Sequence, residues 1–256
     1  MNLAERIKSK QNAKSKFIVL AGRRFGGKSS SLGTLPGKTL IIEITDKEAG
    51  ADGAIAVAKE LGNTVDVVTG NDSQDALELA AAGFAEGYDN VAVDGISALS
   101  EVEADKPKIK KMLNAGGNSV FSGWRMIGNE LTELIQGLKR LSISNNKPVI
   151  LTLALKEKLD GEGNIVNLEP DAKGNVAISF IKGKCNTFLI ARRAADSDGH
   201  PLYVIQTKDD EVYNARVDGV LAKDNPSGFR TELDKVGDPS KVGFAGFLNF
   251  MDNYWK

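Results

Sequence analysis

The residues from Gly22 to Ser29 (GRRFGGKS) match the G-x-x-x-x-G-K-[ST] pattern of a phosphate-binding loop in full. Glycines let the backbone turn its N–H groups toward an anion, and the lysine reaches the β- and γ-phosphates of a nucleotide. The serine hydroxyl ligates the accompanying Mg²⁺. The residues expected to bind the nucleotide are Gly22, Arg23, Arg24, Phe25, Gly26, Gly27, Lys28, Ser29 and Ser30, and Lys28 is also a catalytic candidate.

Another short apolar strand, Val91 to Asp94 (VAVD), ends in a carboxylate. An aspartate at the end of such a strand holds magnesium in nucleotide hydrolases, although many strands end in an aspartate that only caps a turn. With the phosphate loop upstream, we expect Ser29 and Asp94 to ligate Mg²⁺. Two predicted strands fall between them, and this spacing suits the class in which another strand separates the phosphate-loop strand from the strand of the aspartate.

Enzymes of that class carry an acid near the end of an intervening strand, where it polarises the attacking water. Glu43, Asp46 and Glu48 are the candidates. We prefer Asp46 and then Glu48, because Glu43 is expected within the strand and ligands bind beyond the carboxyl ends of parallel strands; all three can also be solvated turn acids. Thr152, like Lys156 after it, is placed to sense the γ-phosphate, or else Thr152 is a buried hydroxyl with internal partners.

Strands and helices alternate over the first 155 residues. Apolar runs predict strands, helical spacing predicts helices, and Ser73 is the expected N-cap of one helix. This alternation indicates a parallel sheet covered on both faces. The predicted strands are 17–21, 39–44, 64–68, 90–93 and 148–155, and the predicted helices are 28–32, 51–61, 73–85 and 124–141.

The rest of the chain is β-rich and is expected to extend the same sheet. A hairpin is predicted over 156–167 and strands over 187–193 and 201–207, followed by a helix over 244–255. The expected organisation is a basic N-terminal segment (1–16), a nucleotide-binding core (17–235) and a C-terminal helix (236–256).

Composition excludes several classes of function. The 256 residues carry a net charge of −1, so a nucleic-acid site must be a local patch. Cys185 and His200 are the only residues of their types, which excludes a disulfide framework and a thiolate or multi-histidine metal site. No apolar run approaches the roughly 20 residues that span a bilayer, and the basic N-terminus lacks a signal core, so we expect a cytoplasmic protein.

With these residues placed, the chain resembles the RecA-like phage P-loop ATPases of the nucleotide-binding, single-strand-annealing recombinase type. The resemblance covers nearly the whole chain: the phosphate loop, the acidic strand 41–43, the segment 88–97 (YDNVAVDGIS), and the glycine-containing hairpin after Lys156. It implies an α/β fold with a RecA-like core, a β-rich C-terminal extension, and ATP and Mg²⁺ as ligands. The chain departs from the family where a glutamate is usual, because Thr45, Asp46 and Glu48 compete for that place.

The family also implies self-association and single-stranded DNA as a partner. RecA-like proteins place DNA loops after the strand of Asp94, where this chain has a lysine-rich segment, with Phe121 and Trp124 nearby to stack on bases. A solvated charge run beside core aromatics is the alternative. The candidates for DNA binding are Lys106, Lys108, Lys110 and Lys111. A neighbouring subunit is expected to complete the ATP site, with Lys208 and Arg216 preferred over Arg192 and Arg193.

Two functions therefore remain open. The first is an ATPase that assembles on single-stranded DNA in recombination or annealing, with Mg-ATP at subunit interfaces. The second is a slow or non-hydrolysing nucleotide-binding protein that acts as a structural switch in phage or complex assembly. Asn146 to Val149 (NKPV) lacks the aspartate of the guanine-specific N-K-x-D motif, which favours adenine.

Overall fold

The structure, a computed structural model, describes residues 15–44, 50–163, 165–175, 178, 179, 181, 185, 187–195, 201–207 and 243–254. Four predicted site residues lie outside these ranges, as does the predicted domain boundary at 235/236. They are Asp46, Glu48, Lys208 and Arg216. No helix in the described ranges is long and apolar enough to cross a membrane.

A mostly parallel sheet forms the centre of the fold, with strand order β3-β2-β4-β5-β1-β7-β8 and with β6 paired to β5 outside that path. The strands from β3 to β7 in this order are parallel to their neighbours, whereas β8 is antiparallel to β7 and β6 to β5. β5 therefore separates the phosphate-loop strand β1 from β4, which confirms the predicted order. The strands are β1 (Phe17–Gly22), β2 (Lys38–Ile44), β3 (Thr64–Gly70), β4 (Asn90–Asp94), β5 (Val149–Leu159), β6 (Ile165–Pro170), β7 (Thr187–Ala195) and β8 (Pro201–Gln206).

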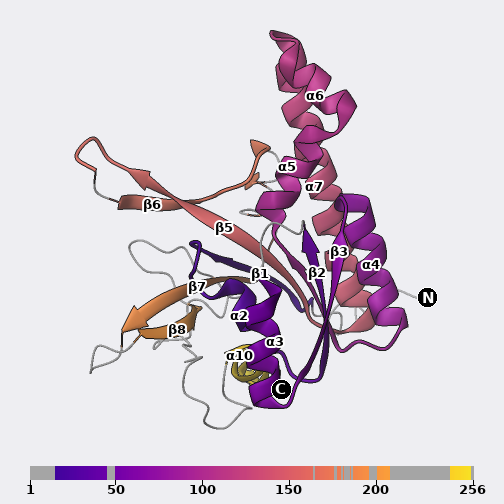
Figure 1. Cartoon of the computed structure of the whole chain (residues 1–256), viewed down its shortest axis with the longest axis vertical. Helices are drawn as coiled ribbons and strands as arrows, with labels where there is room; N and C mark the ends of the chain where they lie inside the picture. The colour runs from indigo at the N-terminus through magenta and orange to yellow at the C-terminus, as the bar shows by residue number, and fades with distance from the viewer. Residues whose placement is uncertain are drawn as a thin grey trace, which may run out of the picture.

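Helices cover both faces of this sheet (Figure 1). One core packs α4, α5 and α7 against the sheet, and the other packs α2, α3 and α10 against the opposite face. β1 is buried along its whole length, with Val19 in the first core and Leu20 in the second, because successive side chains of a strand point to opposite faces. The helices are α2 (Lys28–Leu32), α3 (Ala51–Leu61), α4 (Ser73–Ala85), α5 (Ile96–Asp105), α6 (Pro107–Asn114), α7 (Asn118–Asn145) and α10 (Gly243–Tyr254).

The lysine-rich segment differs from the prediction, because it is helical rather than a loop. α5 and α6 occupy it, and α6 begins with Pro107, a residue that suits the first turn of a helix. α7 begins at Asn118, well before the predicted start at Trp124. Figure 1 shows α6 and the first turns of α7 extending away from the sheet.

β5 is also longer than predicted. Its first half lies in the parallel sheet between β1 and β4, and its second half pairs with β6 to form a two-stranded arm. The hairpin predicted around Gly161 to Gly163 is therefore confirmed, and so is the extension of the sheet by β7 and β8. The C-terminal helix α10 packs into the core that also contains α2 and α3, through Phe244 and Phe247, which are both fully buried.

Candidate functional site

The phosphate loop joins the end of β1 to α2 at the carboxyl edge of the sheet. Its glycines leave room for the neighbouring strand: a Cβ on Gly22 would lie 2.3 Å from the carbonyl oxygen of Ala191 in β7, and one on Gly26 would lie 3.0 Å from it. Phe25 and Gly27 have positive φ angles of 61° and 84°. β7 thus forms one wall of the loop, and the loop adopts the sharply turned backbone that its sequence predicts.

Lys28 folds back over the loop. Its Nζ donates hydrogen bonds to the carbonyl oxygens of Gly22 at 3.2 Å and Arg23 at 3.0 Å. The Arg23 guanidinium pairs with Glu157 of the β5–β6 arm at 2.9 Å. Arg24 and Phe25 face solvent, and the Phe25 side chain is 93% exposed. The lysine ammonium is therefore held at the loop, where an anion cradled by the loop would meet it.

Ser29 and Asp94 converge on one small space beside Gly50. A Cβ on Gly50 would lie 2.8 Å from Ser29 Oγ and 3.2 Å from Asp94 Oδ2. A hydroxyl and a carboxylate are the hard oxygen ligands that Mg²⁺ prefers, and the ion takes its remaining ligands from water and phosphates. The residues present therefore fit a Mg²⁺ ion. Consistent with so few protein ligands, the described ranges hold no group of three or more His, Cys, Asp or Glu residues that could bind a metal by themselves.

Thr152 is 1% exposed and holds the Asp94 carboxylate. Its hydroxyl donates to Asp94 Oδ1 at 2.5 Å and accepts from the backbone N–H of Gly95 at 2.8 Å. Because the single hydroxyl proton is donated to Asp94 and cannot also be donated to a phosphate, the buried-hydroxyl interpretation describes Thr152 better than contact with a phosphate.

Glu43 lies directly beside Asp94, because the register of β2 and β4 pairs the two residues. Its Oε1 accepts hydrogen bonds from the backbone N–H groups of Gly50 at 3.1 Å and Ala51 at 3.3 Å. Burial raises the pKa of Glu43, the two hydrogen bonds oppose the shift, and the charges of Asp94 and Asp52 add to it. Glu43 is within the strand, as expected, yet it reaches the site; of the three candidate acids it alone is in the described ranges.

Sequence reasoning missed Gly50 and Ala51, which come to the site from the start of α3. A glycine before a helix gives no signal of a neighbouring metal ligand. The signal for Glu43 was present, since β2 and β4 both carry an acid near their carboxyl ends. Aligning those ends as parallel neighbours brings the two acids together.

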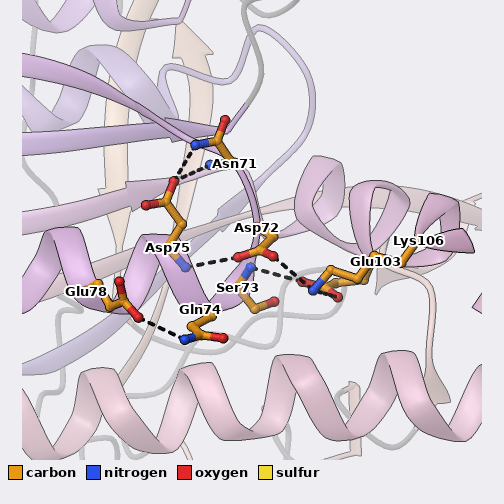
Figure 2. Close-up of polar contacts among 8 residues, drawn as sticks. All are labelled: Asn71, Asp72, Ser73, Gln74, Asp75, Glu78, Glu103 and Lys106. Carbon is orange, nitrogen blue, oxygen red and sulfur yellow. Dashed lines mark hydrogen bonds and ion pairs between the residues drawn. The ribbon is translucent and has the colours of Figure 1, made fainter. Parts of the chain in front are cut away.

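The four candidate lysines for DNA separate into two groups. Lys106 points inward and pairs with Asp72 at 3.1 Å and with the fully buried Glu103 at 2.8 Å (Figure 2). Burial lowers the pKa of Lys106, but the two carboxylates outweigh it and the net pKa is raised. Lys106 therefore pairs with two acids of its own chain in this structure, and its contact with DNA stays a prediction.

Lys108, Lys110 and Lys111 are exposed on α6. Lys110 pairs with Asp105 at 2.9 Å. Phe121 is 75% exposed and Trp124 37% exposed on the adjoining turns of α7, so neither is a core aromatic.

Of the basic residues considered as the contribution of a neighbouring subunit to the ATP site, Arg192 and Arg193 are in the described ranges. Arg192 is half-buried and Arg193 exposed, both on β7 beside the phosphate-loop strand.

A comparison with protein-family models finds no match, and neither does a comparison with curated proteins. The function is therefore inferred from the residues of the site.

Proposed function

We propose that the protein binds Mg-ATP at the loop from Gly22 to Ser30 and hydrolyses it as a RecA-like ATPase. The observation that carries this proposal is the convergence of Ser29 and Asp94 on the space beside Gly50, with Glu43 next to Asp94 in register. A phosphate-loop pattern alone identifies a ligand; the three oxygen-bearing side chains beside it add the means to hold a metal and a water.

The residues divide the chemistry among them. The loop N–H groups and Lys28 bind the phosphates, and Ser29 and Asp94 would hold the Mg²⁺, which neutralises phosphate charge when bound. Glu43 orients a water toward the γ-phosphate and accepts its proton. The raised pKa of Glu43 makes the carboxylate a stronger base than an ordinary glutamate, which favours that role. Glu43 thus takes the place for which Asp46 and Glu48 were preferred.

The sheet order supports the RecA-like assignment. β5 lies between β1 and β4, and β2 brings its acid to the other side of Asp94. In this proposal the protein works in the cytoplasm as a homo-oligomer, and a basic residue of a neighbouring subunit completes the ATP site. Lys208 and Arg216 remain the candidates for that residue.

Single-stranded DNA is the proposed partner, and it binds the basic tip, which we define as residues 107–126 of α6 and the start of α7. No acidic residue occurs between Lys106 and Asn129, although the chain as a whole has a net charge of −1. Exposed lysines neutralise backbone phosphates, and the exposed rings of Phe121 and Trp124 stack on unpaired bases. The protrusion of the tip in Figure 1 leaves it accessible to a strand.

The alternative, a slow nucleotide-dependent switch, is favoured by one observation. Glu43 Oε1 already accepts two backbone hydrogen bonds from the start of α3, and these bonds compete with a water for the carboxylate. Both functions share nucleotide binding and differ in turnover. Steady-state phosphate release therefore distinguishes them.

Nucleotide binding and turnover test the main proposal. Wild type should bind a fluorescent ATP analogue with Mg²⁺ and release phosphate, and Lys28→Ala should lower turnover at least about 100-fold because a cation on the transferring phosphate is lost. An exposed lysine on α3, Lys59, supplies the matched control Lys59→Ala. Equal turnover in Lys28→Ala and Lys59→Ala would reject the assignment, and wild-type binding without turnover would favour the switch.

Fluorescence anisotropy with a labelled oligothymidylate tests the partner. Lys108→Ala/Lys111→Ala should weaken binding and flatten its salt dependence, and Phe121→Ala should weaken it about tenfold. Lys59→Ala should leave the affinity unchanged. No binding by wild type at low salt, with or without Mg-ATP, would reject DNA as the partner.

A further inference from the structure

The backbone conformation of Gly50 does not require glycine. Its φ of −78° and ψ of −31° lie in the right-handed helical region that every residue adopts. Gly50 is the N-cap of α3, where glycine is favoured over alanine but serine, aspartate and asparagine are at least as favourable as glycine. A glycine here must therefore be explained by its surroundings.

The surroundings of Gly50 are three groups of the proposed metal and water site. A Cβ would lie 2.8 Å from Ser29 Oγ and 3.2 Å from Asp94 Oδ2, and the first of these is closer than Cβ atoms approach a neighbour in real proteins. On its other side, the Gly50 N–H donates to Glu43 Oε1 at 3.1 Å. The start of α3 thus lies against Ser29, Asp94 and Glu43.

We propose that Gly50 is a positioning residue for the metal: its missing side chain keeps open the space between Ser29 and Asp94, and its N–H fixes the Glu43 carboxylate. The inference rests on the proposed Mg-ATP site. It adds Gly50, a residue outside the phosphate-loop pattern, to the groups that line that site. A methyl group at this position would occupy the space that the ion and its waters share with the two oxygens. Nucleotide binding through the loop alone does not need that space.

A packing explanation for Gly50 makes a different prediction. Small residues also let α3 approach α2 closely, since a Cβ on Gly53 would lie 2.6 Å from Ser30 Oγ and one on Gly33 would lie 2.2 Å from the carbonyl oxygen of Ala54. Gly53 lies one turn along the same helix, and the three atoms nearest to a Cβ there all belong to Ser30. Gly53→Ala therefore crowds the same pair of helices without entering the metal space, and it is the matched control.

The test compares the dissociation constant of a fluorescent ATP analogue in Mg²⁺ with that in EDTA. Wild type should bind at least about tenfold more tightly with Mg²⁺, and Gly50→Ala should bring this ratio close to one while its affinity in EDTA changes by less than about threefold. Gly53→Ala should keep the wild-type ratio. Electron paramagnetic resonance of Mn²⁺ in the nucleotide complex should show the same loss in Gly50→Ala, independently of turnover.

Two results separate failure of this inference from failure of the proposed function. If wild type binds no nucleotide in either condition, the proposed function fails. If wild type shows the Mg²⁺ enhancement and Gly50→Ala retains it, with Mn²⁺ bound as in wild type, Gly50 has no role at the metal and the inference alone is overturned. Equal loss of the ratio in Gly50→Ala and Gly53→Ala would overturn it in favour of helix packing.

A second pair of variants covers a Gly50→Ala chain that is too crowded to fold, which thermal unfolding would reveal. Ser29→Gly removes both Ser29 atoms that the added methyl meets, so Ser29→Gly/Gly50→Ala has room to fold. Because Ser29→Gly already removes a metal ligand, adding Gly50→Ala should change the remaining ratio by less than about twofold. The inference is overturned if the Mg²⁺-to-EDTA affinity ratio of the double variant is lower than that of Ser29→Gly by the full factor seen for Gly50→Ala alone. If Gly50→Ala alone does not fold, a tenfold lower ratio overturns it, because the two effects would then be independent.

Discussion

Two groups of charged side chains lie at the carboxyl edge of the sheet, and their carboxylates have different kinds of partner. In the first, Glu43 and Asp94 receive hydrogen bonds from backbone N–H groups and from Thr152. No ion pair within the described ranges involves either acid. In the second, shown in Figure 2, Asp72 and Glu103 both face the ammonium of Lys106. In the function we propose, the first group takes its cation from outside, whereas the second already contains Lys106.

One acid of each group has a shifted pKa, and the two shifts run in opposite directions from different causes. Burial and the neighbouring charge of Asp94 raise the pKa of Glu43. The hydrogen bond from the Asp75 N–H and the contact with Lys106 lower the pKa of Asp72. Burial and the charge of Asp94 disfavour the ionised form of Glu43, and the two backbone hydrogen bonds offset part of that cost, whereas the hydrogen bond from Asp75 and the lysine stabilise the ionised form of Asp72. The difference agrees with the proposal that the first group binds a ligand and the second supports the fold.

The largest effect is expected at Asp94. Asp94→Asn keeps an oxygen to accept from Thr152 but removes the negative charge, so phosphate release should fall about 1000-fold. The free energy of unfolding should stay equal or rise, because the charge next to Glu43 is removed. Stopped-flow phosphate release and urea unfolding measure the two quantities. A loss of stability without a loss of turnover would place Asp94 with the structural acids.

Glu43→Gln should have the next largest effect, lowering turnover about 100-fold because the amide accepts no proton. Nucleotide affinity should stay within about twofold of wild type. In wild type the rate should fall as pH drops through the raised pKa of Glu43, since the carboxyl is protonated below it. That fall should begin at a higher pH than an ordinary glutamate gives, and it should be absent in the variant. A pH–rate profile that is identical in both proteins contradicts the assignment.

Glu103→Ala should mainly affect folding. It leaves Lys106 without its closest partner and the Ser73 N–H without the oxygen that accepts from it at 2.9 Å. Breaking a buried pair costs several kcal/mol, but Lys106 is about one-third exposed, so we expect a loss of about 2 kcal/mol in the free energy of unfolding. Glu101→Ala, an exposed change on the same helix, should cost less than about 0.5 kcal/mol. Urea unfolding of both variants tests this; equal losses would mean that Glu103 is not a structural acid.

The sheet and the phosphate loop followed from local patterns in the sequence. An apolar run that ends in a glycine predicted β1, and the short strand before Asp94 predicted β4. The strand between them in space followed from their spacing along the chain. These features depend on residues close together in sequence, or on rules of connection that hold for most parallel sheets.

The helical form of the basic tip and the place of Glu43 beside Asp94 did not follow, because both depend on distant contacts. α6 contains four polar or charged residues and one buried residue, Ile109. Ile109 packs into the first core, and α6 also contacts α7. Lys106 pairs with Glu103, three residues before it, and with Asp72, which is more than thirty residues away in the chain and lies near it only in the folded protein. Likewise, Glu43 reaches the site only because the register of β2 places it opposite Asp94.

The smallest effect is expected at Asp72, where the sequence had placed the helix cap one residue later, at Ser73. Asp72 accepts from the Asp75 N–H at 2.9 Å and is the N-cap of α4. Asp72→Ala should lower the free energy of unfolding by about 1 kcal/mol at neutral pH. Because the folded-state pKa of Asp72 is lowered, this contribution is present above the ordinary aspartate pKa and is lost as pH falls through the folded value. Wild type and variant should therefore converge in acid, whereas Glu78→Ala on the exposed side of α4 should differ from wild type by less than about 0.5 kcal/mol at either pH. A deficit in Asp72→Ala that persists unchanged in acid would mean that the Asp72 charge does not stabilise this second group.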